Sequence, residues 1–233
     1  MVTRVSAAIV PAAGSGQRLV HPAALAADGQ RPKALRMLAG RTMVHRCVEQ
    51  LLHAVDYVVV AAPTAHVEAV RADLSPLGSR VQTVGGGPTR QRSVAAALTA
   101  LDDALDLVLV HDAARPLVPV DVIRRVLDFL VGGAAAVVPV VDVADSLRHR
   151  CGGEAKGPLD RSTVCAVQTP QGFQRAVLER AHAAAADAEA TDDATLVERL
   201  GYALTLVEGD PRAFKITTPL DLLLAEAVIA DQR

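Results

Sequence analysis

The sequence has few aromatic residues and no tryptophan, since Phe, Tyr and Trp together make up 2% of its 233 residues. Proteins that hold single-stranded nucleic acid usually stack its bases on aromatic side chains, so this class is disfavoured. The formal net charge is −2, and the chain therefore also lacks the basic excess typical of DNA- and RNA-binding proteins. We expect no nucleic-acid partner, and any anionic ligand must be small and bound by local positive charge.

Long apolar runs and cysteine motifs are missing as well. No stretch of about 18 apolar residues occurs, so we expect no membrane span and no membrane partner. The first residues lead into an apolar run without the pattern of a signal peptide. The three cysteines, Cys47, Cys151 and Cys165, show no CxxC spacing, which argues against a disulfide framework or a zinc site. These features predict a cytoplasmic protein.

The chain does have apolar, β-branched runs that alternate with helical patterns, and 51% of its residues are hydrophobic. The predicted strands are 5–10, 57–62, 81–84, 105–110, 134–139, 203–207 and a short strand at Lys215. The predicted helices are 43–54 with Thr42 as its cap, 66–74, 90–101, 121–131, 173–190, 192–200 and a last helix from Pro219 to about 230. This order predicts a mostly parallel sheet with helices on both faces, in a single α/β domain that spans 1–233.

Residues 141–167 differ from the rest because they are polar and charged around a Gly152-Gly153 turn signal. The pattern predicts a hairpin that leaves the domain as an arm. A disordered surface loop is the alternative interpretation, and composition does not decide between the two.

The first apolar run ends in the turn Pro11-Ala12-Ala13-Gly14-Ser15-Gly16-Gln17-Arg18. Small residues let a ligand approach the backbone, free N–H groups can cradle a phosphate, and Arg18 adds a fixed positive charge. The turn is not a full dinucleotide fingerprint, because Leu19 stands where the third glycine belongs, and it lacks the Lys-Ser/Thr ending of a Walker A loop. Taken alone, it fits a plain connection between strand and helix equally well.

Two further segments, 85–93 and 111–115, also follow predicted strands. Ligands of such sheets bind beyond the carboxyl ends of the strands, so we expect the three segments to converge on one rim. Arg18, Lys33 and Lys215 are cations near strand or turn ends, and together they suit a triphosphate and a pyrophosphate leaving group. A lone lysine is more often a solvated surface charge.

Asp112 and His111 directly follow a predicted buried strand. Asp112 is a candidate to hold a divalent metal or a ribose hydroxyl, or it only forms the turn. We interpret His111 as a packed turn residue rather than a base, since a phosphate nucleophile needs none. The remaining histidines are scattered, so neither a metal cluster nor a Ser-His-Asp triad is predicted.

These motifs occur together in the order typical of one family: 11–18, Pro32-Lys33, Gly86-Gly87-Pro88-Thr89-Arg90-Gln91-Arg92-Ser93-Val94, His111-Asp112-Ala113-Ala114-Arg115-Pro116, Asp160-Arg161, Gln168-Thr169-Pro170-Gln171-Gly172-Phe173, Thr191-Asp192-Asp193-Ala194 and Lys215-Ile216-Thr217. Over nearly its full length the chain resembles the 2-C-methyl-D-erythritol 4-phosphate cytidylyltransferases of the non-mevalonate isoprenoid pathway. The resemblance implies a three-layer α/β/α, Rossmann-like nucleotidyltransferase fold with a protruding β-arm. It also implies that CTP and methylerythritol phosphate react, with Mg²⁺, to give the CDP-alcohol and pyrophosphate.

The resemblance further assigns roles to residues. Arg18, Lys33 and Lys215 would be catalytic, and Asp112 would lie near the ribose and the metal. The residues that would bind the nucleotide are Pro11, Ala12, Ala13, Gly14, Gly16, Gly86, Gly87, Ser93, Asp112 and Ala113. Those that would bind the second substrate are Asp112, Arg115, Ser146, Arg161, Thr169 and Thr191, of which Thr191 is also a candidate helix cap.

In this family the arm reaches into a partner subunit, so we expect a homodimer that exchanges arms; here Ser146 stands where Thr is common. One departure is the longer connection 21–31 before Lys33, from which we expect Lys33 to be mobile without CTP. Two alternatives remain. One is a cytidylyltransferase for ribitol 5-phosphate or another polyol phosphate, and the other is a catalytically silent nucleotide-binding subunit. The retention of all three cations argues against the silent subunit.

Overall fold

The computed structural model describes residues 5–14, 32–185 and 189–231. Its centre is an eight-stranded sheet with the order β10-β7-β11-β6-β1-β4-β5, in which β12 also pairs with β7. The strands are β1 (Val5–Pro11), β4 (Tyr57–Ala62), β5 (Val81–Gly85), β6 (Leu105–Val110), β7 (Ala136–Asp142), β10 (Cys165–Val167), β11 (Gln171–Gln174) and β12 (Thr205–Glu208). A small hairpin joins β2 (Met37–Leu38) to β3 (Arg41–Thr42).

The adjacent strands β6, β1, β4 and β5 run parallel to one another. β1 pairs with β4 and β6, β4 with β5, and β7 with β12 in the same direction, whereas β10 and β11 are antiparallel to their neighbours. Successive residues of β1 are buried on opposite faces, because Ala8 and Val10 belong to one apolar cluster and Ala7 and Ile9 to the other. Burial on both faces explains why this strand reads as a continuous apolar run.

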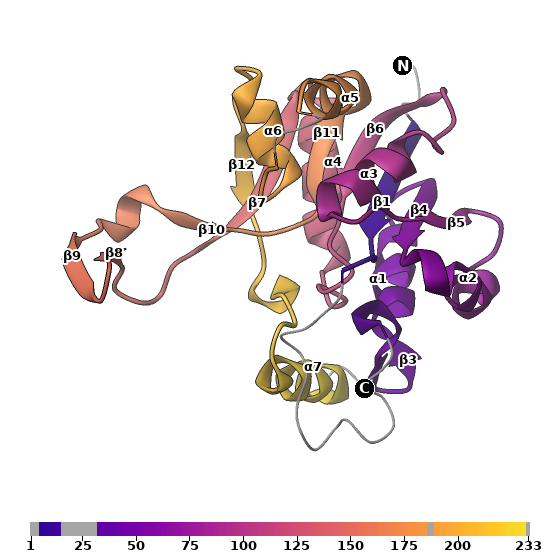
Figure 1. Cartoon of the computed structure of the whole chain (residues 1–233), viewed down its shortest axis with the longest axis horizontal. Helices are drawn as coiled ribbons and strands as arrows, with labels where there is room; N and C mark the ends of the chain where they lie inside the picture. The colour runs from indigo at the N-terminus through magenta and orange to yellow at the C-terminus, as the bar shows by residue number, and fades with distance from the viewer. Residues whose placement is uncertain (1–4, 15–31, 186–188, 232–233) are drawn as a thin grey trace.

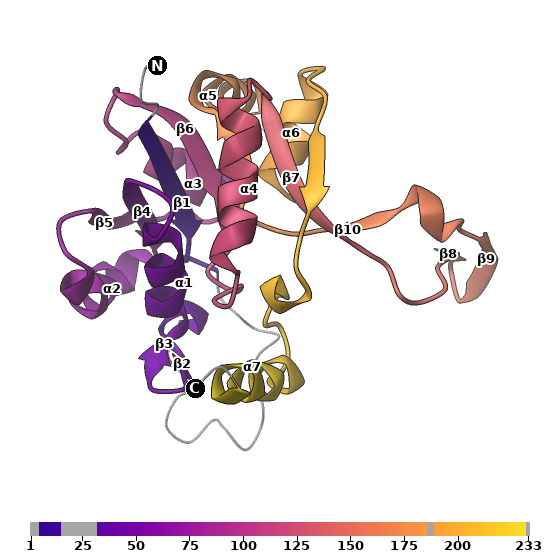
Figure 2. The ribbon, with the colours of Figure 1, turned by 180° about the vertical axis from the view of Figure 1, so that it is seen from behind.

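Helices cover both faces of the sheet. The α-helices are α1 (Met43–Leu52), α2 (Val67–Leu74), α3 (Arg90–Leu98), α4 (Val120–Val131), α5 (Arg175–Ala184), α6 (Asp193–Arg199) and α7 (Pro219–Asp231). Short 3-10 turns lie at η2 (Lys33–Leu35), η3 (Thr64–His66), η4 (Ser75–Leu77), η5 (Arg161–Thr163) and η6 (Pro211–Ala213). Helices α3, α5 and α6 lie on one face (Figure 1), and α1, α2 and α4 lie on the other (Figure 2). Their buried side chains belong to the two apolar clusters on either side of the sheet. The predicted three-layer α/β/α architecture is confirmed.

Local sequence signals start several of these helices. The Thr42 hydroxyl caps α1 by accepting a hydrogen bond from the His45 N–H, as predicted. At the start of α7, Thr218 and Asp221 exchange hydrogen bonds around Pro219, which forms a capping box. α7 lies away from the sheet and packs on a third apolar cluster with Leu38, Met43 and Ile216. No helix within the described ranges is long and apolar enough to cross a membrane.

Three sequence predictions are wrong. The helix predicted for 173–190 begins only at Arg175 and ends at Ala184, because Phe173 belongs to β11, where it is fully buried between Val108 and Ala136. Lys215 is not in a strand, since its neighbour Ile216 makes one backbone hydrogen bond to Ala114 and no ladder follows. Thr191 does not cap α6: the cap is Asp192, which accepts from the Thr195 N–H.

The polar segment 141–167 forms an ordered hairpin that projects sideways from the body (Figure 1). Its tip is the pair β8 (Arg148–Cys151) and β9 (Glu154–Pro158), joined at the Gly152-Gly153 turn. Its base belongs to the main sheet, because Cys165 to Val167 pair with Val140 to Asp142. Every residue of β8 and β9 is exposed, so the arm has no core of its own in a single chain.

Candidate nucleotide and phosphate site

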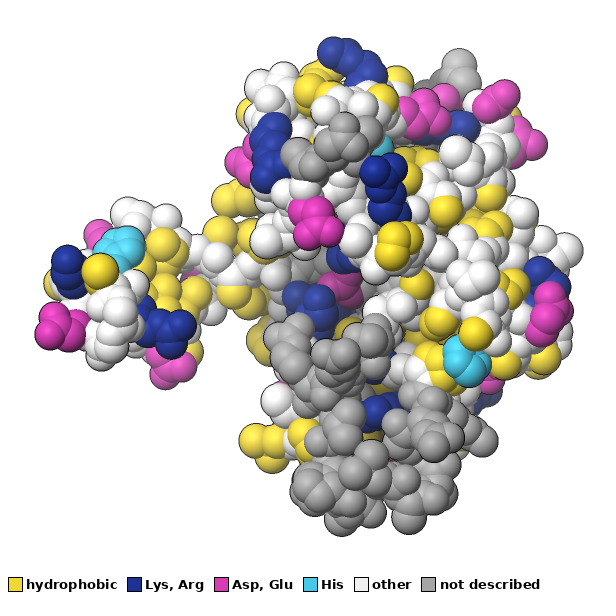
Figure 3. Space-filling view, viewed as in Figure 1, with side chains coloured by type: hydrophobic (Ala, Val, Ile, Leu, Met, Phe, Trp, Pro, Cys, Tyr) yellow, Lys and Arg dark blue, Asp and Glu magenta, His cyan; other side chains and the backbone are white. Residues whose placement is uncertain are grey.

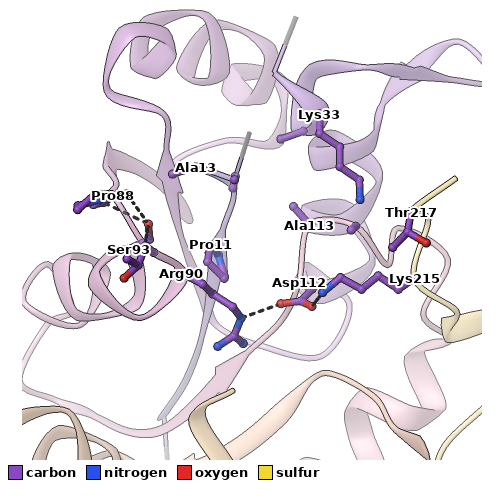
Figure 4. A pocket seen from close by; sticks show the side chains of 16 residues that line it. Pro11, Ala13, Lys33, Pro88, Arg90, Ser93, Asp112, Ala113, Lys215 and Thr217 are labelled. Carbon is purple, nitrogen blue, oxygen red and sulfur yellow. Dashed lines mark hydrogen bonds and ion pairs between the residues drawn. The ribbon is translucent and has the colours of Figure 1, made fainter. Parts of the chain in front are cut away.

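A cavity of about 630 Å³ opens at the sheet edge where β1 and β6 end. Its lining comprises Pro11, Ala12, Ala13, Gly14, Lys33, Ala34, Gly87, Pro88, Thr89, Arg90, Ser93, Asp112, Ala113, Ala114, Lys215 and Thr217 (Figure 4). The space-filling view shows side chains of both charges in a hollow near the middle of this face (Figure 3). The three segments predicted to meet on one rim do meet here.

Main-chain groups and small side chains form one wall of the cavity. The Ala12 N–H donates to the Ala61 carbonyl at 2.8 Å, and the Gly86 N–H donates to the Ala62 carbonyl at 2.7 Å. These bonds hold the two turns against β4. Gly86 is not itself in the lining, but a Cβ there would lie 2.7 Å from the Cβ of Ala13. Glycine at this position therefore lets the two turns pack together.

Ser93 holds the second glycine turn in place. Its hydroxyl is buried at the start of α3, donates to the Thr89 carbonyl at 2.9 Å and accepts from the Gly87 N–H at 3.1 Å. Thr89 caps the same helix by accepting from the Arg92 N–H. The predicted pair of Gly87 and Ser93 is thus one hydrogen-bonded unit in the cavity wall.

Asp112 stands between two cations on the opposite wall (Figure 4). Its Oδ1 accepts from Arg90 Nε at 3.0 Å, and its Oδ2 accepts from Lys215 Nζ at 2.7 Å. Arg90 also donates from Nη1 to Asp193 Oδ2 at 2.5 Å. Burial raises the pKa of Asp112, but the charges and hydrogen bonds of Arg90 and Lys215 outweigh it and hold that pKa well below its ordinary value. Asp112 is therefore ionised at neutral pH.

His111 and Thr169 fix the main chain beneath Asp112. The Asp112 N–H donates to Thr169 Oγ1 at 3.1 Å, and that oxygen lies 3.0 Å from His111 Nδ1. The other ring nitrogen, Nε2, lies 3.1 Å from the Arg115 carbonyl. Since a carbonyl only accepts, Nε2 carries the proton and Nδ1 accepts from Thr169. Burial lowers the pKa of His111 to about 4, so the ring is neutral, and the prediction of a packed turn residue is confirmed.

Several residues predicted to bind the second substrate lie outside the lining. Thr169 is buried behind Asp112, and Arg115 donates to the Ala213 carbonyl at 2.6 Å. Thr191 is exposed just before α6. Ser146 and Arg161 are on the arm, where Arg161 Nη1 donates to the Ala144 carbonyl at 2.5 Å.

Of the remaining predicted residues, some line the cavity and others lie outside the described residues. Lys33 begins η2 and lines the cavity, so its place there is as predicted, whereas its mobility stays a prediction. Arg18 and Gly16 lie outside the described residues, as does the connection 21–31, and their roles stay predictions.

Arg90 lines the cavity, but the sequence motif that contains it predicts no role for it. A signal was present: Arg90 is the first residue of a helix, where the helix dipole disfavours a cation. A positive charge at such a position indicates a partner elsewhere, and here the partners are Asp112 and Asp193. Thr217, which also lines the cavity without an assigned role, carried no comparable signal.

The described part of the cavity offers few protein ligands for Mg²⁺. Asp112 is the only carboxylate of the described lining, and the described residues contain no group of three or more metal-ligating side chains. A carboxylate oxygen suits this hard cation, which usually takes one or two protein ligands and fills its shell with phosphate oxygens and water. The donor set fits a metal that arrives with a nucleotide, and Asp112 is the lining residue that could hold it.

The parallel sheet, the glycine turns and the cations at its carboxyl edge define a nucleotidyltransferase. The model of the 2-C-methyl-D-erythritol 4-phosphate cytidylyltransferase family, IspD, matches residues 6–231. The chain belongs to this family.

Individual relatives agree with the family match. The chain is 49% identical to the 2-C-methyl-D-erythritol 4-phosphate cytidylyltransferase of Rhodococcus jostii, with 96% of this chain and 95% of the relative covered. It is 46% identical to that of Streptomyces coelicolor, with coverages of 98% and 86%. The crystal structure of the Thermus thermophilus enzyme superposes with a TM-score of 0.80 at 39% identity and covers 98% of this chain and 100% of its own.

Proposed function

We propose that the cavity is where this cytidylyltransferase joins CTP to 2-C-methyl-D-erythritol 4-phosphate in isoprenoid biosynthesis. A phosphate oxygen of the methylerythritol phosphate attacks the α-phosphorus of CTP. The bond from that phosphorus to the bridging oxygen breaks, and pyrophosphate leaves with the electron pair. No proton has to be removed from a phosphate nucleophile, so positioning and charge neutralisation supply the catalysis.

One observation carries this proposal: Lys33 and Lys215 reach the same cavity from chain segments far apart, opposite a wall of backbone and small residues. Backbone at Ala12 to Gly14 holds the nucleotide, and the Gly87–Ser93 unit reads the cytosine. The two lysines, with Arg18, stabilise the negative charge that grows on the leaving pyrophosphate.

Lys215 changes partner when the nucleotide binds. In the structure the ammonium group of Lys215 is 2.7 Å from Asp112. A triphosphate offers more negative charge than one carboxylate, so Lys215 turns toward the phosphates. Asp112 keeps its hydrogen bond from Arg90, and its released oxygen is then available to the Mg²⁺ that accompanies the nucleotide or to the ribose. The metal supplies Lewis-acid neutralisation of phosphate charge.

The second substrate requires a second subunit. Arg115, Thr169 and Thr191 are on the body of the molecule, whereas Ser146 and Arg161 are on the arm that projects away from it (Figure 1). A two-fold dimer that exchanges arms brings Arg161 and Ser146 to the partner's cavity. We therefore propose one domain over 1–233, with the arm at about 141–167 as its dimerisation element. A cytoplasmic location is part of this proposal and agrees with three unpaired cysteines.

Pyrophosphate release measured with a panel of nucleotides and polyol phosphates tests the function. CTP with methylerythritol phosphate and Mg²⁺ is expected to turn over, and ATP and GTP are expected to be far poorer. Equal turnover of ribitol 5-phosphate would instead indicate a broader polyol-phosphate enzyme. Tight CTP binding without turnover of any polyol phosphate would indicate a silent nucleotide-binding subunit.

A further inference from the structure

A buried chain of alternating charges continues from Asp112 into the protein. Arg90 bridges Asp112 and Asp193, and Asp193 Oδ1 lies 2.8 Å from His182 Nε2. The side chains of Asp193 and His182 are 1% and 6% exposed. These groups come from α3, α5 and α6, whereas Asp112 follows β6. Three helices thus contribute to holding one carboxylate at the cavity.

Helix capping does not explain this arrangement. Asp192 caps α6, and the neighbouring Asp193 instead directs both oxygens sideways to Arg90 and His182. Burying charges is costly unless they are paired, and an apolar set would stabilise the same contact between helices at least as well. Arg90 Nη2 is also buried without a partner among the described residues. A group present only for stability usually has all its donors satisfied.

The geometry shows what the chain does for Asp112. Thr169 fixes the Asp112 main chain through its N–H, while Arg90 Nε holds Oδ1 and thereby the rotation of the carboxylate. The other oxygen, Oδ2, is then directed to Lys215. Asp193 in turn keeps the Arg90 guanidinium in the plane in which Nε meets Asp112. Burial lowers the pKa of Arg90, but the carboxylates of Asp193 and Asp112 raise it further, so Arg90 stays charged.

We propose that Arg90 and Asp193 are positioning residues that orient Asp112 for cytidylyl transfer. The inference rests on the proposed role of Asp112 in the cavity. It predicts that substitution lowers kcat/KM most at Arg90, less at Asp193 and least at His182. This is the order in which the three residues follow Asp112 along the buried series of charges.

A double-mutant cycle separates positioning from mere stability. Arg90→Gln and Asp112→Asn are each expected to lower kcat/KM for pyrophosphate release by roughly 10-fold or more. Because Arg90 acts through Asp112, the double variant is expected to be no worse than Asp112→Asn alone. Asp193→Asn is expected to lose less than Arg90→Gln, and Arg90→Lys to recover part of the loss because it keeps a charge. Arg124→Gln, the same change on the exposed face of α4, is the matched control and is expected to keep wild-type activity.

Assays run well below each variant's unfolding temperature, with folding checked by circular dichroism. Wild-type turnover of folded Arg90→Gln, or losses that multiply in the double variant, would overturn the positioning role while leaving the site proposal intact. Wild-type turnover of Asp112→Asn would refute the role of Asp112 itself and the inference with it. If Arg90→Gln does not fold, Arg90→Lys and Asp193→Asn each take its place in the cycle with Asp112→Asn.

Discussion

The cavity wall and the arm differ in how firmly their residues are held within one chain. Around the cavity, Asp112, Arg90 and Ser93 are held by several partners each, and the main-chain turns are tied to β4. On the arm, the strands β8 and β9 are exposed along their whole length, and Arg161 donates a hydrogen bond to the carbonyl of Ala144 on the same arm. An isolated two-stranded hairpin is marginal in water. The body thus forms its part of the proposed site within one chain, whereas the proposed dimer would give the arm a second surface to pack on.

The largest expected effect comes from removing charge at the cavity. Lys33→Ala and Lys215→Ala are each expected to lower kcat/KM by roughly 10²-fold or more, because each loses a charge-assisted contact to the transition state. Thermal unfolding is expected to change little, since the Lys215 side chain is 40% exposed and Asp112 keeps Arg90 as a partner. Near-wild-type turnover of Lys33→Ala would show that the longer connection before it has displaced this lysine from the chemistry.

The second effect tests whether the arm completes a partner's site. Lys33→Ala and Arg161→Ala homodimers are each expected to be nearly inactive. After subunit exchange, about half of the dimers are mixed. Each mixed dimer has one site with both lesions and one with neither, so about a quarter of all sites recover. Pyrophosphate release gives the activity, and native mass spectrometry confirms the exchange. Activity that stays at the level of the separate variants would mean that Arg161 acts within its own subunit or not at all.

The third effect is a pH dependence of the free energy of unfolding, and it comes from a residue of the body, His111. Burial lowers the pKa of His111 from 6.5 to about 4, so the unfolded chain binds a proton there before the folded one does. The neutral ring contributes fully to the free energy of unfolding above about pH 6.5. As the pH drops toward 4, this contribution falls by on the order of 3 kcal/mol. His111→Asn keeps an acceptor for Thr169, and its denaturant-unfolding free energy is expected to depend less on pH over this interval. An unchanged pH slope would contradict the assignment of a neutral buried ring.

The smallest effect compares one glycine from each region. Gly86→Ala is expected to destabilise the protein by about 1–3 kcal/mol and to raise the KM for CTP, because its Cβ would meet Ala13 and Ser93. Gly153→Ala on the arm has nothing within 4 Å of an added Cβ, so its stability is expected to stay near wild type. Thermal unfolding and CTP titration of both variants measure the contrast. Equal losses would show that crowding is not what selects glycine at Gly86.

Local sequence was enough for much of the fold. The bounds of β4 and β6 agree with the apolar runs, and the Thr42 cap agrees with the start of α1, since each is decided by neighbouring residues. It failed at β11, because a four-residue strand is too short to show a period and lies next to a helical pattern. It also failed at the start of α6, where Thr191, Asp192 and Asp193 are all suitable residues and only the three-dimensional partners separate the cap from the buried anchor.

For this protein, the sequence by itself determined the parallel α/β plan, the glycine turns and the cations that belong at a phosphate site. These follow from short-range backbone preferences and from apolar periodicity. Only the tertiary structure decided that Lys215 meets Asp112 and that Arg90 meets Asp193, pairs that are each 103 residues apart in the chain. No local pattern encodes such a pairing, because it arises from the packing of helices and strands that bring distant charges into one buried space.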